Sequence, residues 1–296
     1  MKPLFILAMD HRDSFERVVY HVAGVPTPEE DGAFADGKKL VFDGLRAALT
    51  LFPTDQADAG VLVDEELGAA VARVAPDVGV VLAMPLEKSG QKIFELEYGE
   101  DWVRHLLVFH AKYAKVLVRD NPADDPADRA LQAGRLAEVS AKLIEIGVPL
   151  LFELLIPATD EQLASVGGDV YRYDTEVRPG LTVDCIHYFQ SQKVEPAIWK
   201  IEGLDTVEAA QSVVAAAREG GRDSVQCIVL GRDAPIERVD HWLQVAASVD
   251  GFNGFAVGRS IWQQPLVDHV AGKINDDTAI EIIGNNYLHF VRAYLG

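Results

Sequence analysis

The stretch YAKVLVRDNPADDPADRALQAGRLAEVSAKLIEIGVPLLFELLIP, residues 113–157, contains the unit that decides the fold. It opens with an apolar run at Ala114–Val118, passes through a polar turn into a segment with helical spacing at Asp128–Ile146, and closes with a second apolar run at Val148–Phe152. Strands that helices cover on their faces read as uninterrupted apolar runs of this kind. The stretch therefore predicts two parallel strands joined by a helix.

The rest of the chain repeats this pattern, with six more apolar runs that each lead through polar residues into a segment with helical spacing. The eight predicted strands are Leu4–Met9, Ala59–Val63, Val78–Met84, Ala114–Val118, Val148–Phe152, Ala197–Ile201, Val225–Leu230 and Gly254–Val257. Predicted helices are Gly37–Leu51, Asp128–Ile146, Thr206–Arg218, Pro235–Ser248, Ile261–Ala271 and Thr278–Tyr294, with Asp205 and Asp277 as N-caps. Long loops, which are candidate lids, are expected at residues 20–34, 85–100 and 169–179.

Eight strand–helix units in 296 residues match the count of a (β/α)8 barrel. We therefore expect an α/β protein with one (β/α)8 (TIM) barrel domain over residues 1–296. An open, doubly wound sheet is the alternative. The barrel is favoured because it uses all eight runs. It would also gather the charged residues that follow the runs at the carboxyl ends of the strands, where barrel enzymes carry their active sites.

The charge balance excludes several classes of partner. The chain has 27 Lys and Arg against 46 Asp and Glu, a formal net charge of −19. Such a protein repels nucleic acid and anionic membranes, so we expect neither as a partner, and an anionic ligand would need a few cations concentrated in a pocket. Only two cysteines, a short apolar run near the N-terminus and no apolar stretch of membrane-spanning length predict a cytoplasmic protein.

Two lysines inside apolar runs are the most informative single residues. Lys200 lies in PAIWKIEG (196–203) and Lys115 in YAKVLVRD (113–120). Burial and a second nearby cation both lower the pKa of an amine, and a neutral amine is a nucleophile toward carbonyl groups. The alternative for either residue is a strand-end lysine that reaches solvent. Two such lysines in one acidic chain favour a catalytic role.

Other candidates also stand at the ends of predicted strands. Glu153 ends its run in VPLLFELLIP (148–157), where a carboxylate can pair with a lysine and serve as a general acid and base. Asp10 ends the first run, with a simple cap as its alternative role. Gly231 follows the seventh run and the pair Gly258-Arg259 the eighth, which is where barrels often bind phosphate through backbone amides and a helix N-terminus.

These segments resemble class I (Schiff-base) aldolases with a (β/α)8 barrel. The resemblance rests on PLFILAMDHRDSF (3–15), YAKVLVRDNPADD (113–125), VPLLFELLIP (148–157), PAIWKIEGL (196–204) and FAVGRSIW (255–262), which occur in the family's order and span almost the whole chain. The chain is similar to the tagatose-bisphosphate and fructose-bisphosphate aldolases. It looks more like the aldolase-type domain, formerly of unknown function, that is fused behind sugar kinases of inositol catabolism. No kinase portion is present in this sequence.

The resemblance implies a role for each candidate. Lys200 would form the Schiff base and Glu153 would shuttle protons. Lys115 would keep Lys200 neutral and Glu153 ionised, and Asp10 would hold a substrate hydroxyl or Lys115. The phosphate would be bound by Gly231, Gly258 and Arg259. The implied substrate is 2-deoxy-5-keto-gluconate 6-phosphate, which would yield dihydroxyacetone phosphate and malonate semialdehyde. Its carboxylate would need a further cation, for which Arg12, Arg119 and Arg232 are candidates. No cofactor and no metal are implied.

Several alternatives remain open at the level of the sequence. The substrate could be another phosphoketose, such as a tagatose or sulfo-sugar phosphate, and a miscounted strand would exchange the roles of Lys115 and Lys200. Asp10, His11, Asp64 and Glu65 could meet at the barrel mouth and hold the metal of a metal-dependent lyase or isomerase. A non-catalytic barrel that binds a sugar phosphate is the third class. The partner expected in each case is a small sugar phosphate, and the sequence leaves homo-oligomers open.

Overall fold

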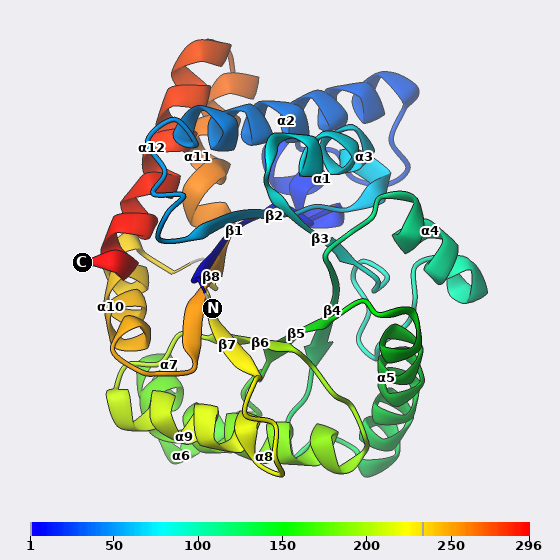
Figure 1. Cartoon of the computed structure of the whole chain (residues 1–296), viewed down its shortest axis with the longest axis vertical. Helices are drawn as coiled ribbons and strands as arrows, with labels where there is room; N and C mark the ends of the chain where they lie inside the picture. Colours follow the sequence, from blue (N-terminus) through cyan, green and yellow to red (C-terminus); the bar gives the residue numbers. More distant parts are fainter. Residues whose placement is uncertain (1, 233) are drawn as a thin grey trace.

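The computed structural model describes residues 2–232 and 234–296, and within them eight parallel strands close into a barrel (Figure 1). The strands pair in chain order, and β1 is hydrogen-bonded to both β2 and β8. The strands are β1 (Leu4–Ala8), β2 (Asp58–Leu62), β3 (Val81–Pro85), β4 (Tyr113–Arg119), β5 (Leu150–Leu155), β6 (Ile198–Glu202), β7 (Gln226–Leu230) and β8 (Phe252–Val257). The (β/α)8 barrel is therefore confirmed, and the open sheet is excluded because β1 and β8 close the ring.

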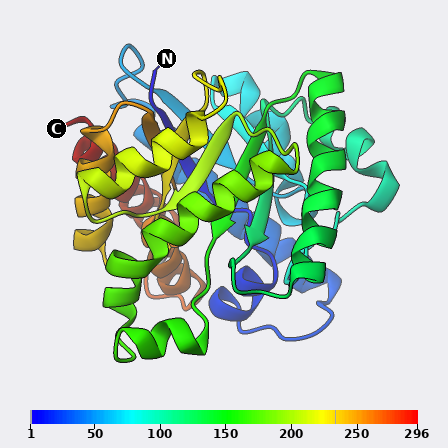
Figure 2. The same ribbon diagram turned by 90° about the horizontal axis from the view of Figure 1, so that it is seen from below.

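Helices surround the barrel on the outside (Figure 1). They are α1 (Asp13–Val19), α2 (Pro28–Ala48), α3 (Glu65–Val74), α4 (Trp102–Val108), α5 (Pro126–Ile146), α6 (Asp160–Ser165), α7 (Val170–Arg172), α8 (Arg178–Ser191), α9 (Val207–Arg218), α10 (Ile236–Ala247), α11 (Arg259–Val270) and α12 (Asp276–Leu295). Short 3-10 turns lie at Pro76–Val78 and Gly99–Asp101, and a π-helical turn at Tyr173–Val177 leads into α8. Figure 2 shows the barrel from the side, with the N-terminus at its upper end.

Two of the three expected loops contain helices, which corrects the sequence analysis. Within residues 20–34, Thr27 and Glu30 form a reciprocal capping box, so α2 begins at Pro28 rather than near Gly37. Residues 169–179 hold α7, the π-helical turn and the first residues of α8. The segment 85–100 is mostly irregular, as expected, with one antiparallel bridge between Glu87 and Leu96.

Two helix caps also differ from the prediction. Thr206, one residue after the predicted Asp205, caps α9 by accepting a hydrogen bond from the backbone N–H of Ala209. Asn275 rather than Asp277 caps α12. In each case the side-chain oxygen of a neighbouring residue accepts a hydrogen bond from the backbone N–H three residues further on. The aspartate was expected to accept this hydrogen bond.

The alternation of side chains along the strands determines which residues enter the barrel. Leu4, Ile6 and Ala8 of β1, Leu151 of β5 and Ile198 of β6 belong to the small apolar cluster that fills the interior. Residues two apart in a strand share a face. The positions two residues further on toward the carboxyl ends are therefore the next to point inward, and they belong to the functional site.

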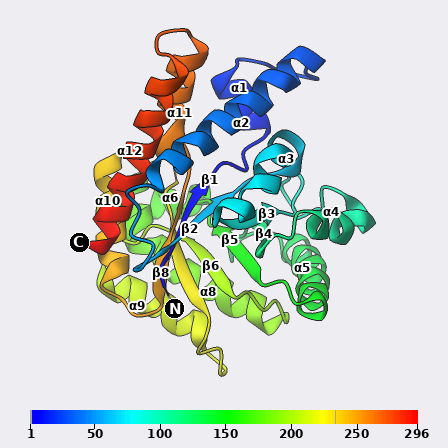
Figure 3. The same cartoon turned by 45° about the horizontal axis from the view of Figure 1, so that its top comes forward.

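A larger apolar core lies between the barrel and its helices and includes the fully buried Trp199, Trp242 and Trp262. The helix α12 packs against α2, α10 and α11, and Figure 3 shows α2, α11 and α12 gathered beside β1 and β8. Both cysteines are buried and free. In the part of the chain that the structure describes, no helix has the length and apolar character needed to cross a membrane.

Candidate active site

A cavity of about 370 Å³ opens at the carboxyl ends of the strands. Its lining has four acidic side chains, Asp10, Asp13, Glu87 and Glu153, and eight basic ones among the described residues. Besides Lys115 and Lys200, the basic residues are Arg12, Arg17, Lys88, Arg119, Arg232 and Arg259. A chain with a net charge of −19 thus concentrates positive charge in one cavity, and such a cavity attracts anions.

Glu153 lies between the two lysines predicted from the sequence. It is the direct register neighbour of Lys200 across the β5–β6 pair, and both follow inward-facing residues of the barrel core by two positions. Its Oε1 is 2.8 Å from the Lys200 Nζ, and its Oε2 is 2.9 Å from the Lys115 Nζ. All three side chains are almost completely buried. The predicted juxtaposition of two strand lysines and a glutamate is thus present in the structure.

Lys115 contacts two further carboxylates. Its Nζ is 2.7 Å from Asp10 Oδ2 and 2.6 Å from Glu87 Oε1, so three carboxylates, one from β5 and two from the segments after β1 and β3, surround one ammonium group. Burial alone would lower the pKa of Lys115, but these three carboxylates outweigh it and raise the pKa well above its usual value. Lys115 is therefore a fixed cation at neutral pH.

The pKa values of the three carboxyl groups depend on how strongly Lys115 and Lys200 attract each one. Burial would raise the pKa of Asp10 and of Glu153, but Lys115 and Lys200 hold both below the usual range. For Glu87 the effect of burial is the larger one, and its pKa is raised despite the contact with Lys115. The site therefore pairs two firmly ionised carboxylates with one that binds a proton more readily.

The residues that were predicted to bind phosphate lie in the loops after β7 and β8. Gly258 is the N-cap of the 12-residue helix α11, whose first backbone N–H groups carry the positive end of the helix dipole. A Cβ atom on Gly258 would lie 2.3 Å from the carbonyl oxygen of Ala8, so a glycine is required where the β8–α11 turn passes close to β1. Gly231 and Arg259 line the same cavity as Gly258.

The three other candidate arginines lie in different surroundings. The Arg12 guanidinium is buried, 2.7 Å from Glu97 Oε2, and it also donates to the backbone carbonyl of Glu87. It therefore fastens the segment after β3 to the turn after β1. Arg119 is exposed at the rim and donates to the carbonyl of Gln91.

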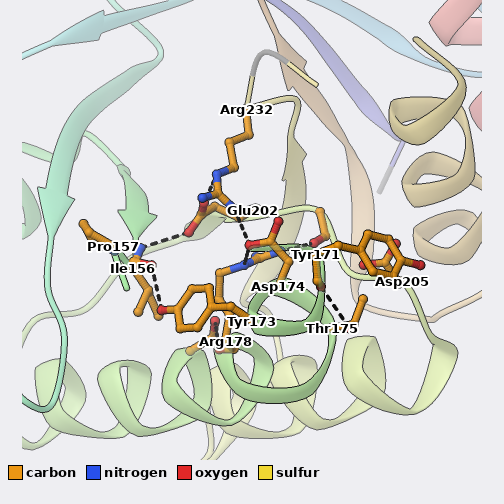
Figure 4. A network of polar contacts seen from close by, with 12 residues as sticks. Ile156, Pro157, Tyr171, Tyr173, Asp174, Thr175, Arg178, Glu202, Asp205 and Arg232 are labelled. Carbon is orange, nitrogen blue, oxygen red and sulfur yellow. Dashed lines mark hydrogen bonds and ion pairs between the residues drawn. The ribbon is translucent and has the colours of Figure 1, made fainter. Parts of the chain in front are cut away.

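Arg232 reaches the cavity from a network of buried charges, shown in Figure 4. Its Nε is 2.9 Å from Glu202 Oε1, and its Nη1 pairs with Asp174 on the π-helical turn before α8. Asp174 also pairs with the buried Arg178, and Glu202 accepts the backbone N–H of Ile156. Two carboxylates thus hold the Arg232 guanidinium in one orientation at the wall between β6 and β7.

Sequence reasoning missed Glu87 as a member of the site. Its position follows from the alternation of side chains along β3. Val81 and Ala83 face the interior of the barrel, so Pro85 and Glu87, two and four residues further on, share that inward face. It also missed Lys38, a fully buried lysine of α2. Lys38 follows Phe34 by four positions and precedes Val41 by three, so it occupies the apolar stripe of its helix, and this spacing was the available signal.

The residues proposed for a metal site do not converge. Asp64 Oδ1 pairs with Lys38 while its Oδ2 caps α3, and Glu65 pairs with His105. Within residues 2–232 and 234–296, no group of three His, Cys, Asp or Glu is arranged to hold a metal ion. Burial lowers the pKa of His11 to about 4, with Asp10 opposing the shift, so its imidazole is neutral at pH 7.

Comparisons with solved structures place aldolases among the structural neighbours. A Schiff-base-forming fructose-1,6-bisphosphate aldolase matches with a TM-score of 0.54 and 16% identity, over 93% of this chain and 94% of that one. An archaeal fructose 1,6-bisphosphate aldolase matches with a TM-score of 0.55 and 15% identity, over 96% and 94%. A fructose-bisphosphate aldolase from Slackia heliotrinireducens matches with a TM-score of 0.54 and 13% identity, over 96% and 86%. At these identities the likeness establishes the shared fold.

At the level of sequence, a search of curated proteins found no match. A family model, in contrast, covers residues 1–295, which is almost the whole chain. The chain therefore belongs to the bacterial family described as "Uncharacterized protein conserved in bacteria (DUF2090)".

Proposed function

We propose that this protein is a class I aldolase, which cleaves or forms a carbon–carbon bond of a phosphorylated ketose or keto acid through a Schiff base on Lys200. The observation that carries the proposal is the chain Lys200–Glu153–Lys115, in which one buried carboxylate forms ion pairs with both lysines at 2.8 and 2.9 Å. Glu153 can take a proton from Lys200 and remain bound to Lys115. An amine beside a buried base is the arrangement that imine formation requires.

The contacts of the two lysines support Lys200 as the nucleophile. Three carboxylates hold Lys115 in its protonated form, so its nitrogen has no lone pair to attack a carbonyl. Among the described residues, Lys200 has one ion pair, to Glu153. This difference in charge environment favours the role assignment that the strand order suggested over the exchanged one.

The proposed reaction balances with Glu153 as the sole proton carrier. Glu153 takes a proton from Lys200, the neutral amine adds to the ketone carbon, and Glu153 returns this proton to the carbonyl oxygen. Glu153 then takes a second proton from the nitrogen and delivers it to the carbinolamine hydroxyl, which leaves as water. The iminium then accepts the electron pair of the bond between the α and β carbons as that bond breaks, while Glu153 takes the proton of the hydroxyl on the β carbon and the aldehyde is released. The remaining enamine is protonated at the α carbon, and hydrolysis frees dihydroxyacetone phosphate and Lys200.

The arrangement of cations supports a substrate with an anionic group at each end. Gly258 and Arg259 follow β8, whereas Lys88 follows β3 and Arg119 is the last residue of β4. The strands β3 and β4 lie across the ring from β7 and β8. A phosphate at the β7–β8 wall would leave the far end of the substrate near the opposite wall. We propose 2-deoxy-5-keto-gluconate 6-phosphate, as the resemblance implies, with its carboxylate bound by Arg119.

Borohydride trapping tests the proposal directly. The protein is incubated with dihydroxyacetone phosphate, treated with borohydride, and examined by intact mass and peptide mapping. The expected result is a single adduct on Lys200 that is absent from Lys200→Ala, with Lys142→Ala, an exposed lysine, as the control that keeps the adduct. An adduct on Lys115 would reverse the roles, and the absence of any adduct from the folded protein with several phosphoketoses would refute Schiff-base chemistry.

A further inference from the structure

Lys38 is a buried lysine that does not line the cavity, yet it contacts the segment that carries Asp10. It lies on α2, is fully buried, and is not among the residues that line the cavity. Its Nζ donates to the backbone carbonyls of Met9 and His11, at 2.7 Å in the case of His11, and to Asp64 Oδ1 at 2.7 Å. The three hydrogens of the ammonium group therefore have three acceptors.

The two carbonyls belong to the residues on either side of Asp10. The turn that they define follows β1, and Asp10 leaves it to reach Lys115 at 2.7 Å. Met9 is also tied to β2, because its backbone N–H donates to the carbonyl of Leu62 at 2.8 Å. A single side chain thus fixes both flanks of the Asp10 residue.

The remaining acceptor of Lys38 anchors it to the neighbouring unit of the barrel. Asp64 is as buried as Lys38, and its second oxygen accepts the backbone N–H of Leu67 at 2.7 Å as the N-cap of α3. The ring of Phe15 lies 4.6 Å from the Lys38 Nζ and covers it. An ammonium group held in this way has neither the freedom nor the exposure to meet a substrate.

We propose that Lys38 is a positioning residue for the aldolase site: by holding the carbonyls of Met9 and His11 it sets the place of the Asp10 carboxylate, and through Asp10 that of Lys115 and Glu153. The inference rests on the proposed function for its catalytic consequence. A small displacement of a catalytic group costs up to about 100-fold in rate, so the loss of Lys38 reduces turnover although it touches no substrate.

The test uses a half-reaction that needs no aldehyde partner. In deuterium oxide, the Lys200 iminium of dihydroxyacetone phosphate loses a proton from the hydroxymethyl carbon to Glu153, the C–H electron pair forms the enamine, and the return step places a deuteron on that carbon. Proton NMR follows this exchange. Lys38→Met is expected to exchange about 10- to 100-fold more slowly than the wild type. The apparent KM for dihydroxyacetone phosphate is expected to stay within about twofold, because the groups around Gly258 that would bind the phosphate are unchanged.

Two companion variants separate positioning from stability. Asp64→Asn keeps both carbonyl contacts of Lys38, so it is expected to lose thermal stability and retain exchange within about twofold. Lys38→Met/Asp64→Asn removes the unpaired buried charge and regains stability over Lys38→Met, while its exchange rate stays low. Leu143→Ala is the control for stability alone. It leaves a cavity near the end of α5, at the opposite end of the barrel from the site, and is expected to lower the melting temperature without slowing exchange.

The outcomes separate this inference from the proposed function. Exchange by the folded double variant at the rate of Asp64→Asn would overturn the positioning role and leave the aldolase proposal intact. If the wild type itself neither traps nor exchanges, the aldolase proposal fails, and amide hydrogen exchange of the peptide over residues 9–15 decides the inference. Faster amide exchange in the double variant than in Asp64→Asn supports the role of Lys38 in fixing the turn, and equal protection refutes it.

Discussion

Replacing Lys115 by methionine should destabilise the fold by an amount that depends on pH. The ammonium group is surrounded by Asp10, Glu87 and Glu153, whose nearest oxygens lie 2.6–2.9 Å from it. Two such oxygens are at most about 6 Å apart, and at an effective dielectric constant of about 20 two unit charges at that distance repel by about 3 kcal/mol. Without Lys115, this repulsion is opposed at close range by Lys200, whose one ion pair among the described residues is with Glu153.

Proton uptake limits the loss and sets its pH dependence. In the wild type, the pKa values of Asp10 and Glu153 are depressed, so their contribution to stability is present above the unfolded pKa values near 4 and is lost as the pH falls through the folded ones. In Lys115→Met the folded pKa values rise above the unfolded ones, and the sign reverses. The penalty then grows as the pH rises, by about 1.4 kcal/mol per pH unit for each proton that the folded state retains.

Urea denaturation at pH 5.5 and pH 7.5 measures the effect. The expected deficit relative to wild type is about 3–5 kcal/mol at pH 7.5, the usual cost of removing one partner from a buried ion cluster, and it should shrink clearly at pH 5.5. The control is Lys142→Met, whose ion pair with Glu145 has a similar N–O distance of 2.7 Å but is exposed, so its deficit should stay below about 1 kcal/mol at both pH values. A deficit for Lys115→Met below about 1 kcal/mol, or one independent of pH, would refute the reasoning.

Three further predictions concern the cavity. Glu153→Gln should reduce turnover and the rate of imine trapping by about 10²–10⁴-fold, because it removes the proton carrier and leaves the fold intact, as circular dichroism would show; trapping at the wild-type rate would contradict it. Arg259→Met should weaken dihydroxyacetone phosphate binding by about 1.5–3 kcal/mol in calorimetry, and unchanged affinity would remove Arg259 from the phosphate site. Gly258→Ala should lower the melting temperature and weaken the same binding, because its Cβ would meet the Ala8 carbonyl at 2.3 Å; a neutral result would show that the β8–α11 turn can shift at little cost.

The parts of the fold that the sequence predicted are those in which a local pattern and the tertiary structure agree. The eight apolar runs coincide with strands because every strand of the barrel is covered by helices and must be apolar on its outer face. Their ends differ by a few residues where turn chemistry takes over. The third strand begins at Val81 rather than Val78, because Pro76 starts a 3-10 turn that ends at Gly79 with a left-handed φ of 76°.

The residues of the site were predicted where a charge interrupts an apolar run, as Lys200 does in β6 and Lys115 in β4. Glu87 lies just beyond its strand, so no such interruption marks it, and only the alternation of inward-facing positions reveals it. For the arginines, residue type alone gave no indication of what each one contacts. Arg12 and Arg232 form their ion pairs with Glu97 and Asp174, which are 85 and 58 residues away in the chain.

Because the barrel closes between its first and last strands, the site can be completed only late in folding. The carbonyl of Ala8 accepts from Trp262, the carbonyl of Phe5 accepts from Tyr287 of α12, and these partners are 254 and 282 residues apart. Contacts of such long sequence separation form late, because the chain between them must first be ordered. On the ribosome, Asp10 is made early, yet Gly258 can come to lie against Ala8 and His11, on either side of Asp10, only after the last strand and helices have emerged. A nascent chain that has completed seven of the eight strands therefore already contains both lysines and Glu153 but lacks the wall at which the phosphate would bind.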